Sequence, residues 1–180
     1  MVFEKLPLKG LMLITPKIFY DDRGYFFECY NSNDFKDNGI NVNFLQDNQS
    51  LSNKGVLRGL HFQNPPFEQG KLVRVIAGSV RDVVVDIRRK SSTFGQHFIT
   101  ELSGKTNNML WIPPGFAHGF ITLEDNTVFT YKCTNIYIKE SESGIIYNDP
   151  ALGINWGKEN PHVSKKDLQL KKMLDVNILF

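Results

Sequence analysis

Short runs of β-branched and aromatic residues, each ended by Gly, Pro, Asn or Asp, follow one another through most of this chain. We expect strands within residues 11–19, 25–30, 42–50, 56–63, 71–77, 80–87, 96–102, 109–113, 116–123 and 127–137. Many short strands separated by such turn signals are typical of a sandwich or barrel. The sequence therefore predicts an all-β fold.

Two segments depart from this pattern. Residues 32–39 predict a short helix or helical turn that begins at Ser32 or Asn33 and ends at Asn38-Gly39. Ser164 and Asp167 fit a capping box in front of a helix over residues 165–174. No internal repeat or interdomain linker is present, so we expect one domain over residues 1–180.

The composition favours a packed core, because 41% of the residues are hydrophobic and 12% are aromatic. A net charge of +2 gives no sign of a nucleic-acid-binding tail, and no apolar run is long enough to span a membrane. Residues 1–10 lack the apolar stretch of a signal peptide. Cys29 and Cys133 form no metal motif, and we interpret them as free thiols rather than as a disulfide. We therefore expect the protein in the cytoplasm.

Polar residues interrupt the apolar stretch VLRGLHFQ, residues 56–63. A buried charge needs a partner, a ligand or water. Regular alternation would place Arg58 and His61 on opposite faces of a strand. Gly59 lies between them, and glycine in a strand often marks a bulge that shifts the alternation by one residue. We predict that a bulge at Gly59 lets Arg58 and His61 face the same cavity.

A metal site is one interpretation of the histidines. The stretch IPPGFAH, which ends at His118, looks like the second motif of cupin barrels. The first cupin motif has two histidines one residue apart, and after His61 the second one is missing. His61, His118 and Glu68 would still form a two-histidine, one-carboxylate site. Arg58 and Lys71 would repel a divalent cation, so we expect an anionic ligand and no metal.

Each candidate also has a purely structural interpretation. His61 would be a core histidine bonded to the main chain, and Asp167 only a capping carboxylate. Lys71 would be a lysine at a strand end, and Tyr131 a core tyrosine with a satisfied hydroxyl. The residue types alone leave these alternatives open.

The chain carries nine motifs in a fixed order: DDRGYFFE, FLQDNQS, GVLRGLHFQ, QGKLVRV, VVVDIRRKSSTFG, LWIPPGFAHGF, YKCTNIY, NDPALGINW and SKKD. Together they resemble the dTDP-4-dehydrorhamnose 3,5-epimerase family and its sugar-epimerase relatives, from about residue 10 to about residue 170. The resemblance implies a jelly-roll cupin barrel with short peripheral helices, one of them near the C-terminus. It further implies a homodimer, a nucleotide-diphosphate sugar as substrate, and no metal or cofactor.

The resemblance also implies catalytic roles for residues at matching positions. His61 corresponds to the base that removes the proton next to the ketone, and Asp167 to its carboxylate partner. Tyr131 corresponds to the tyrosine that delivers a proton to the opposite face, and Lys71 to the cation beside the developing enolate. Positions that bind nucleotide, diphosphate or sugar are matched by Arg23, Glu28, Gln46, Asn48, Arg58, His118, Glu142 and Lys166.

These residue types suit the implied chemistry. A C–H bond beside a ketone is acidic because the enolate carries its charge on oxygen, and histidine is a base with a near-neutral pKa. A carboxylate orients such a base, and a cation stabilises the enolate oxygen. Inversion needs a second acid on the other face of the sugar. Arginine binds diphosphate oxygens in pairs.

The chain departs from the family pattern at two places. INWGKENP lacks the W-P pair of many relatives, and Ile136 replaces an aromatic residue found in some of them. Ile136 lies in residues 135–143, a segment near the nucleotide in the family. The expected reaction converts dTDP-4-dehydro-6-deoxy-glucose to dTDP-4-dehydrorhamnose. Alternatives are a 3,5- or single-centre epimerase of another nucleotide 4-keto sugar, such as a GDP-linked heptose, and a non-catalytic nucleotide-sugar-binding cupin.

Overall fold

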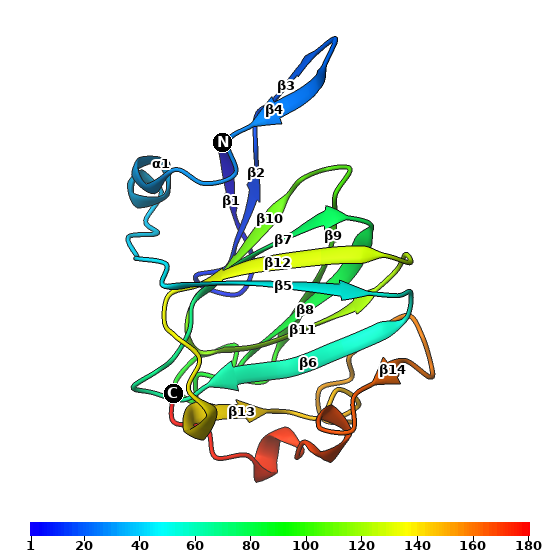
Figure 1. Cartoon of the computed structure of the whole chain (residues 1–180). Coiled ribbons are helices and arrows are strands. Elements are labelled where there is room, and N and C mark those ends of the chain that lie inside the picture. The colour runs from blue at the N-terminus through cyan, green and yellow to red at the C-terminus, as the bar shows by residue number, and fades with distance from the viewer.

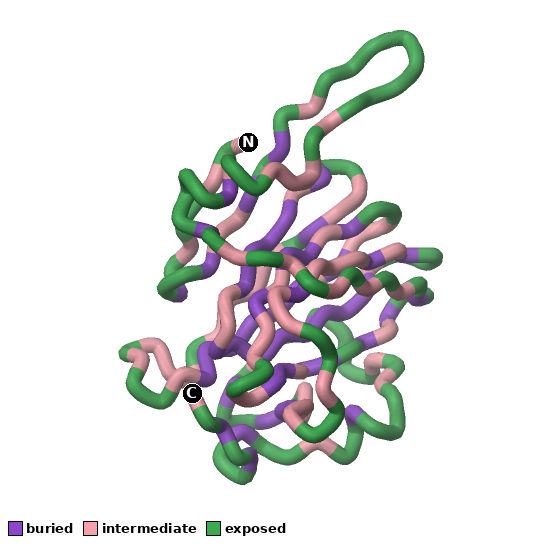
Figure 2. The backbone as a smooth tube through the Cα atoms, turned by 60° about the vertical axis from the view of Figure 1, so that its left-hand side comes forward, coloured by how far each residue is buried: buried purple, intermediate pink, exposed green.

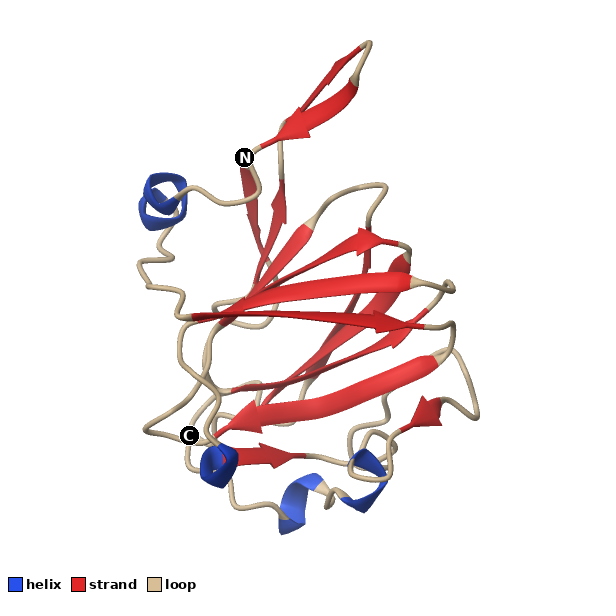
Figure 3. Cartoon of the chain, in the orientation of Figure 1, coloured by secondary structure: helices blue, strands red, loops and turns tan.

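Two facing β-sheets form the body of the computed structural model, which describes residues 1–180 (Figure 1, Figure 3). The first sheet contains, in spatial order, β1 (Val2–Lys5), β2 (Met12–Thr15), β10 (Met109–Ile112), β7 (Lys71–Ala77), β12 (Thr127–Cys133) and β5 (Gln46–Ser52). The second contains β13 (Glu142–Gly144), β6 (Val56–Gln63), β11 (Phe116–Thr122), β8 (Ser79–Asp86) and β9 (His97–Ser103), with β14 (His162–Val163) parallel to β6. The predicted all-β fold is confirmed as a cupin jelly roll.

The remaining elements are peripheral. β3 (Ile18–Asp21) and β4 (Gly24–Phe27) form a hairpin that projects from the body (Figure 1). α1 (Ser32–Asp37) is the only α-helix, and 3₁₀ turns occur at Lys139–Ser141, Asp167–Gln169 and Met173–Asp175. β6 and β7 begin and end where the sequence predicts. The strand expected over residues 11–19 is split at Pro16 into β2 and β3, since proline cannot donate a ladder hydrogen bond.

The cap of α1 lies one residue earlier than predicted. The side chain of Asn31 accepts hydrogen bonds from the backbone N–H groups of Asn33, at 3.0 Å, and Asp34, at 3.5 Å. Asn31 is thus the N-cap, a position at which asparagine is strongly preferred.

The α-helix expected over residues 165–174 is not formed. Ser164 Oγ does accept the backbone N–H of Asp167 at 3.1 Å, as a capping box requires. Leu170 is then extended, with ψ at 150°, and only two 3₁₀ turns remain. The chain instead lies beside Ile145, because the carbonyl of Lys171 accepts the N–H of Ile146 at 2.8 Å. Tertiary pairing therefore overrides the local helix signal.

Three clusters of buried apolar residues lie between the sheets and against their outer faces. Figure 2 shows that the buried stretches of the chain run through the two sheets. Between the sheets, Val73 and Val75 of β7 belong to the same cluster as Val80 and Val84 of β8. The outer face of the second sheet packs against residues 145–180, and that of the first packs partly against α1. Both faces of β8 are therefore buried.

Both cysteines are free, with Cys133 buried and Cys29 half-buried, so the predicted free thiols are confirmed. None of the helices combines the length and the hydrophobicity that a membrane crossing requires.

Candidate functional site

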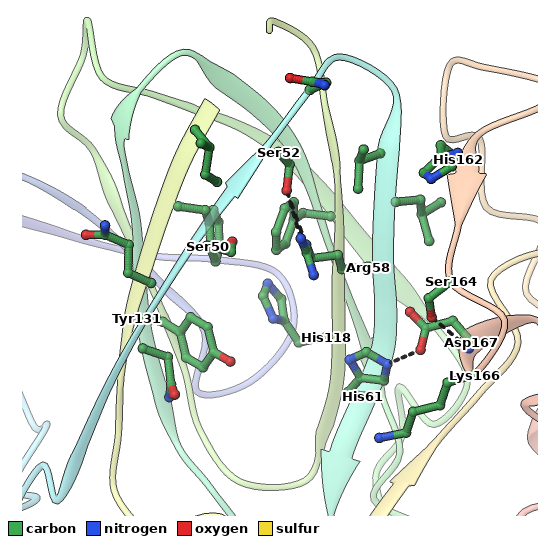
Figure 4. A pocket seen from close by; sticks show the side chains of 18 of the residues that line it. Ser50, Ser52, Arg58, His61, His118, Tyr131, His162, Ser164, Lys166 and Asp167 are labelled. Atoms are coloured by element: carbon green, nitrogen blue, oxygen red, sulfur yellow. Dashed lines mark hydrogen bonds and ion pairs between the residues drawn. The ribbon is translucent and has the colours of Figure 1, made fainter. Parts of the chain in front are cut away.

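A cavity of about 710 Å³ opens between the two sheets, beside β5, β6 and β12 (Figure 4). Eight of the predicted site residues line it: Asn48, Arg58, His61, Lys71, His118, Tyr131, Lys166 and Asp167. Gln46 and Glu142 lie next to it through hydrogen bonds to lining residues, and Arg23 and Glu28 do not reach it.

A bulge in β6 brings Arg58 and His61 to the same cavity. His118 pairs with His61 and Phe120 with Arg58, so two residues of β6 lie opposite one residue of β11 between these pairs. Gly59 has a φ of +127°, and a Cβ at this position would lie 2.5 Å from the Cα of Gly119. Only glycine tolerates both the backbone conformation and the close approach. The predicted bulge is confirmed, and both side chains line the cavity.

His61 is paired with Asp167, which reaches it from the C-terminal segment (Figure 4). His61 Nε2 lies 2.8 Å from Asp167 Oδ1, and Asp167 Oδ2 accepts the backbone N–H of Gly59 at 3.3 Å. Burial acts to raise the pKa of Asp167, but the hydrogen bonds from His61, Gly59 and Ser164 lower that pKa below its usual value. An ionised Asp167 accepts a hydrogen bond from the Nε2–H group of His61, so Nδ1 of the neutral ring is left as a hydrogen-bond acceptor.

Lys71 and Tyr131 come from the neighbouring strands β7 and β12. Burial lowers the pKa of Lys71 and raises the pKa of Tyr131. The Lys71 ammonium lies 5.8 Å from the centre of the Tyr131 ring and has no hydrogen-bond partner within the chain. Tyr131 and His61 lie on opposite walls of the cavity (Figure 4). The site thus has a histidine on one side, a phenol on the other and an unpaired cation beside the phenol.

A second histidine–carboxylate pair lies deeper in the cavity. His118 Nε2 is 2.9 Å and 3.1 Å from the two carboxylate oxygens of Asp82, which is fully buried. The His118 ring stacks on Phe129, with 22° between the ring planes. Asp82 was not predicted as a site residue. Its only sequence signal is an acidic residue on the same face of β8 as the inward-facing Val80 and Val84.

Polar residues of β5 and β6 line the upper part of the cavity. Arg58 Nε and Nη2 both donate to Ser52 Oγ at 3.2 Å, which leaves Nη1 free toward the cavity. Asn48 Oδ1 accepts from Gln46 Nε2 at 3.0 Å. Ser50, Ser52 and His162 also line the cavity and were not predicted, because isolated serines and histidines carry no motif.

An ion pair joins the rim to the C-terminal segment. Lys166 Nζ lies 2.6 Å and 2.7 Å from the oxygens of Glu142, which also accepts the Tyr137 hydroxyl at 2.7 Å. Burial acts to raise the pKa of Glu142, but the bonds from Lys166 and Tyr137 lower it overall. The same carboxylate raises the pKa of both Lys166 and Tyr137. Lys166 is thereby held beside Asp167.

Arg23 and Glu28 lie in and beside the projecting hairpin. Arg23 binds Asp21, and Asn31 donates to Glu28 at 2.9 Å. Both hydrogen bonds are local, and neither residue lines the cavity of its own chain.

The alternative metal site is not assembled. No three His, Cys, Asp or Glu side chains come together in a way that would hold a metal ion. His61 and His118 are each paired with a carboxylate through Nε2, and Glu68 is absent from the cavity lining. The three side chains of the two-histidine, one-carboxylate interpretation are therefore not gathered at one place in this structure.

Comparison with known proteins gives a consistent picture. A family model described as dTDP-4-dehydrorhamnose 3,5-epimerase matches residues 5–175. The dTDP-4-dehydrorhamnose 3,5-epimerase of Shigella flexneri is 46% identical over 174 residues, covering 96% of each chain. That of Salmonella typhimurium (strain LT2) is 49% identical over 169 residues, covering 93% of this chain and 92% of that protein.

A solved structure shares the whole architecture. The dTDP-6-deoxy-D-glucose-3,5-epimerase from Legionella pneumophila Philadelphia 1, in complex with dTDP-4-keto-L-rhamnose, superposes with a TM-score of 0.94. It is 46% identical, and the match covers 98% of this chain and 94% of that one.

Proposed function

The chain belongs to the dTDP-4-dehydrorhamnose 3,5-epimerase family, and we propose that it inverts C3 and C5 of dTDP-4-dehydro-6-deoxy-glucose to give dTDP-4-dehydrorhamnose. It is an epimerase, an isomerase that acts on carbohydrates. The observation that carries the proposal is the pairing of His61 with Asp167 across the cavity from Tyr131 (Figure 4), with the half-buried Lys71 also lining the cavity.

His61 is the base in this proposal. Its Nδ1 removes the proton from the carbon next to the ketone, and the electron pair of that C–H bond moves to form the enolate. Asp167 Oδ1 accepts the hydrogen bond from His61 Nε2, which lies 2.8 Å away. The carboxylate thereby fixes the tautomer and stabilises the imidazolium that results. The low pKa of Asp167 keeps this carboxylate ionised for that purpose.

Lys71 stabilises the enolate oxygen. Its half-buried ammonium has no ion-pair partner within the chain, so the developing negative charge of the enolate supplies one. Burial lowers the pKa of Lys71 because the charged ammonium loses contact with water. An enolate oxygen beside the ammonium stabilises the charged form again.

Tyr131 returns a proton to the other face of the sugar carbon. Its hydroxyl lies on the wall opposite His61, as inversion requires (Figure 4). Burial raises the pKa of Tyr131, so the phenol is protonated at neutral pH and serves as the acid. The phenolate and imidazolium then exchange protons with water, and the cycle repeats at the second carbon.

The polar and cationic groups around this centre bind the rest of the substrate. Arg58, with Nη1 free, suits the diphosphate, and His118 lies between Tyr131 and His61 in the view of Figure 4. In this proposal the sugar or nucleotide contacts two groups of residues. Gln46 and Asn48 belong to β5, and Glu142 and Lys166 form the ion pair at the rim.

A second copy of the chain would bring in Arg23 and Glu28. The β3–β4 hairpin exposes Tyr20 by 73% and Phe26 by 71%, far from the packed core (Figure 2). An apolar patch of this kind marks an interaction surface. We infer a homodimer in which the hairpin docks on the partner, and analytical ultracentrifugation should give twice the chain mass. A monomer would contradict this.

The mechanism needs neither metal nor cofactor, because each step uses a side chain of this protein. Exhaustive chelation should leave the rate unchanged. Loss of activity that one divalent ion restores would contradict this part of the proposal. The free thiols Cys29 and Cys133 fit a reducing compartment, and we propose the cytoplasm as the location.

The decisive experiment follows deuterium. The purified protein is incubated with dTDP-4-dehydro-6-deoxy-glucose in heavy water, and NMR spectroscopy reports uptake at C3 and C5. Uptake at both carbons with inversion is expected. Uptake at one carbon would indicate a single-centre epimerase, and no uptake with retained binding would indicate a non-catalytic protein. A parallel incubation with a GDP-linked heptose tests which nucleotide base and which sugar the enzyme accepts.

A further inference from the structure

The rim segment Ile136–Ile138 follows β12 but joins no sheet. Ile136 and Tyr137 form no hydrogen bond with another main-chain group, and their residues are 48% and 49% exposed. Such a segment gains little from burial or from a ladder of hydrogen bonds, so it would be mobile unless side chains held it.

Gln63, at the end of β6, holds this segment with its whole amide. Its Nε2 donates to the carbonyls of Phe67 at 2.6 Å and Ile136 at 3.1 Å. Its Oε1 accepts the N–H of Ile138 at 2.7 Å. Gln63 is 4% exposed, so these bonds form out of contact with bulk water.

The residue type explains the geometry. Gln63 follows His61 by two positions, where metal-binding cupins have their second histidine. A neutral imidazole offers one donor and one acceptor, whereas the glutamine amide offers two donor protons and an acceptor. Gln63 uses both donors and the acceptor, which no histidine could reproduce.

The held segment is connected to the cavity on two sides. Gln46 Oε1 accepts the N–H of Tyr137 at 2.8 Å, and Gln46 also binds Asn48, which lines the cavity. The Tyr137 hydroxyl binds Glu142, the partner of Lys166. A shift of the rim segment would therefore displace polar groups at the cavity mouth.

We propose that Gln63 is a positioning residue that fixes the rim segment at the cavity mouth for substrate binding. This inference rests on the proposed function. Gln63 does not line the cavity, so it acts through Ile136 and Ile138 and not by contact with the ligand. A segment already ordered before binding saves the conformational entropy that binding would otherwise cost.

Gln63→Met tests the proposal, since methionine keeps the side-chain length and removes all three bonds. We expect the Kd for dTDP, measured by titration calorimetry, and the KM to rise about tenfold, a factor that corresponds to about 1.4 kcal/mol. The kcat should stay within about twofold, because His61 and Tyr131 are untouched. Amide hydrogen exchange of a peptide covering residues 134–138 should become faster.

Asn64→Leu is the matched control. Asn64 is the next residue in the chain and also clamps main chain, donating to the carbonyl of Asn177 at 3.0 Å and accepting the N–H of Leu179 at 3.1 Å. It holds the C-terminal tail and not the rim. We expect Asn64→Leu to lower the Tm about as much as Gln63→Met does, while the Kd for dTDP stays unchanged.

Gln63→Glu is a second variant of the same shape. Its carboxylate cannot donate to the carbonyls of Phe67 and Ile136, so its Kd should rise at least as much as that of Gln63→Met. An unchanged Kd in both Gln63 variants, or an equal rise in Asn64→Leu, would overturn the inference. A wild-type protein that binds dTDP without epimerising the substrate would contradict the proposed function alone.

Discussion

The cavity holds two histidine–aspartate pairs that differ in origin and burial. His118 and Asp82 lie on adjacent strands of one sheet, and their side chains are 7% and 0% exposed. His61 and Asp167 are separated by 106 positions in the sequence, and the His61 side chain is 32% exposed. The first pair is part of the barrel interior, while the second is completed by the C-terminal segment.

The surroundings of the two pairs differ most in their access to solvent. A buried pair inside a sheet is held in place and cannot exchange protons readily with water. The pair at the cavity wall can meet both substrate and solvent. We therefore expect His61, supported by Asp167, to move protons, and His118 and Asp82 to fix the shape and charge of the binding surface.

The largest expected effect is that of His61→Asn. Removal of the base should lower kcat by about 10⁴-fold, at the upper end of general-base contributions. Deuterium uptake at C3 and C5 should be lost together, while dTDP binding by calorimetry should be retained. If exchange persists at the wild-type rate, His118 becomes the candidate base and the proposed division between the pairs is wrong.

Tyr131→Phe should give the next largest effect, about 10²- to 10³-fold on product formation. The enolate still forms through His61, so deuterium exchange without inversion should persist at one carbon or both. The Tm should barely change, because the substitution removes one oxygen and little volume. Turnover at the wild-type rate would exclude Tyr131 from the mechanism.

Paired substitutions test the comparison directly. Asp167→Asn should lower kcat by about 10²-fold, because the tautomer and charge of His61 are no longer supported. Asp82→Asn should instead lower the Tm more than Asp167→Asn does, since it changes a fully buried pair. Kinetics and thermal unfolding of both variants measure this contrast. The reverse ranking in either measurement would exchange the roles assigned to the two pairs.

The smallest expected effect concerns pH and stability. The pKa of Asp167 is lower in the folded protein than in the unfolded chain, where the pKa of an aspartate is about 3.9. The stability that this carboxylate contributes is complete above about pH 4 and is lost as the pH falls through the folded pKa. The Tm of the wild type should therefore fall more steeply between pH 5 and pH 3 than that of Asp167→Asn. Parallel Tm curves would mean that the pair contributes nothing to folding.

Much of the candidate site could be predicted because the motifs and the strand pattern are local. Eight predicted residues line one cavity, and the bulge at Gly59 was recognisable from a glycine between two polar residues. Asp82 was missed because an acidic residue in a buried strand gives no signal of its partner. Arg23 and Glu28 were predicted as ligands, yet both lie outside the cavity of this chain. A local motif does not show where the strand that carries it lies relative to the cavity.

The strands, their turns and the β6 bulge could be predicted from the sequence, because alternation and glycine conformation are properties of neighbouring residues. The folded structure adds what no local pattern gives: the contact of Asp167 with His61 that the family resemblance implied, the hold of Gln63 on the rim segment and the absence of an α-helix over residues 165–174. Each of these depends on groups brought together from distant parts of the chain. At the C-terminal segment, the buried hydrogen bonds of Asp167 and the pairing of Ile146 with Lys171 outweigh a helix propensity of a few tenths of a kcal/mol per residue.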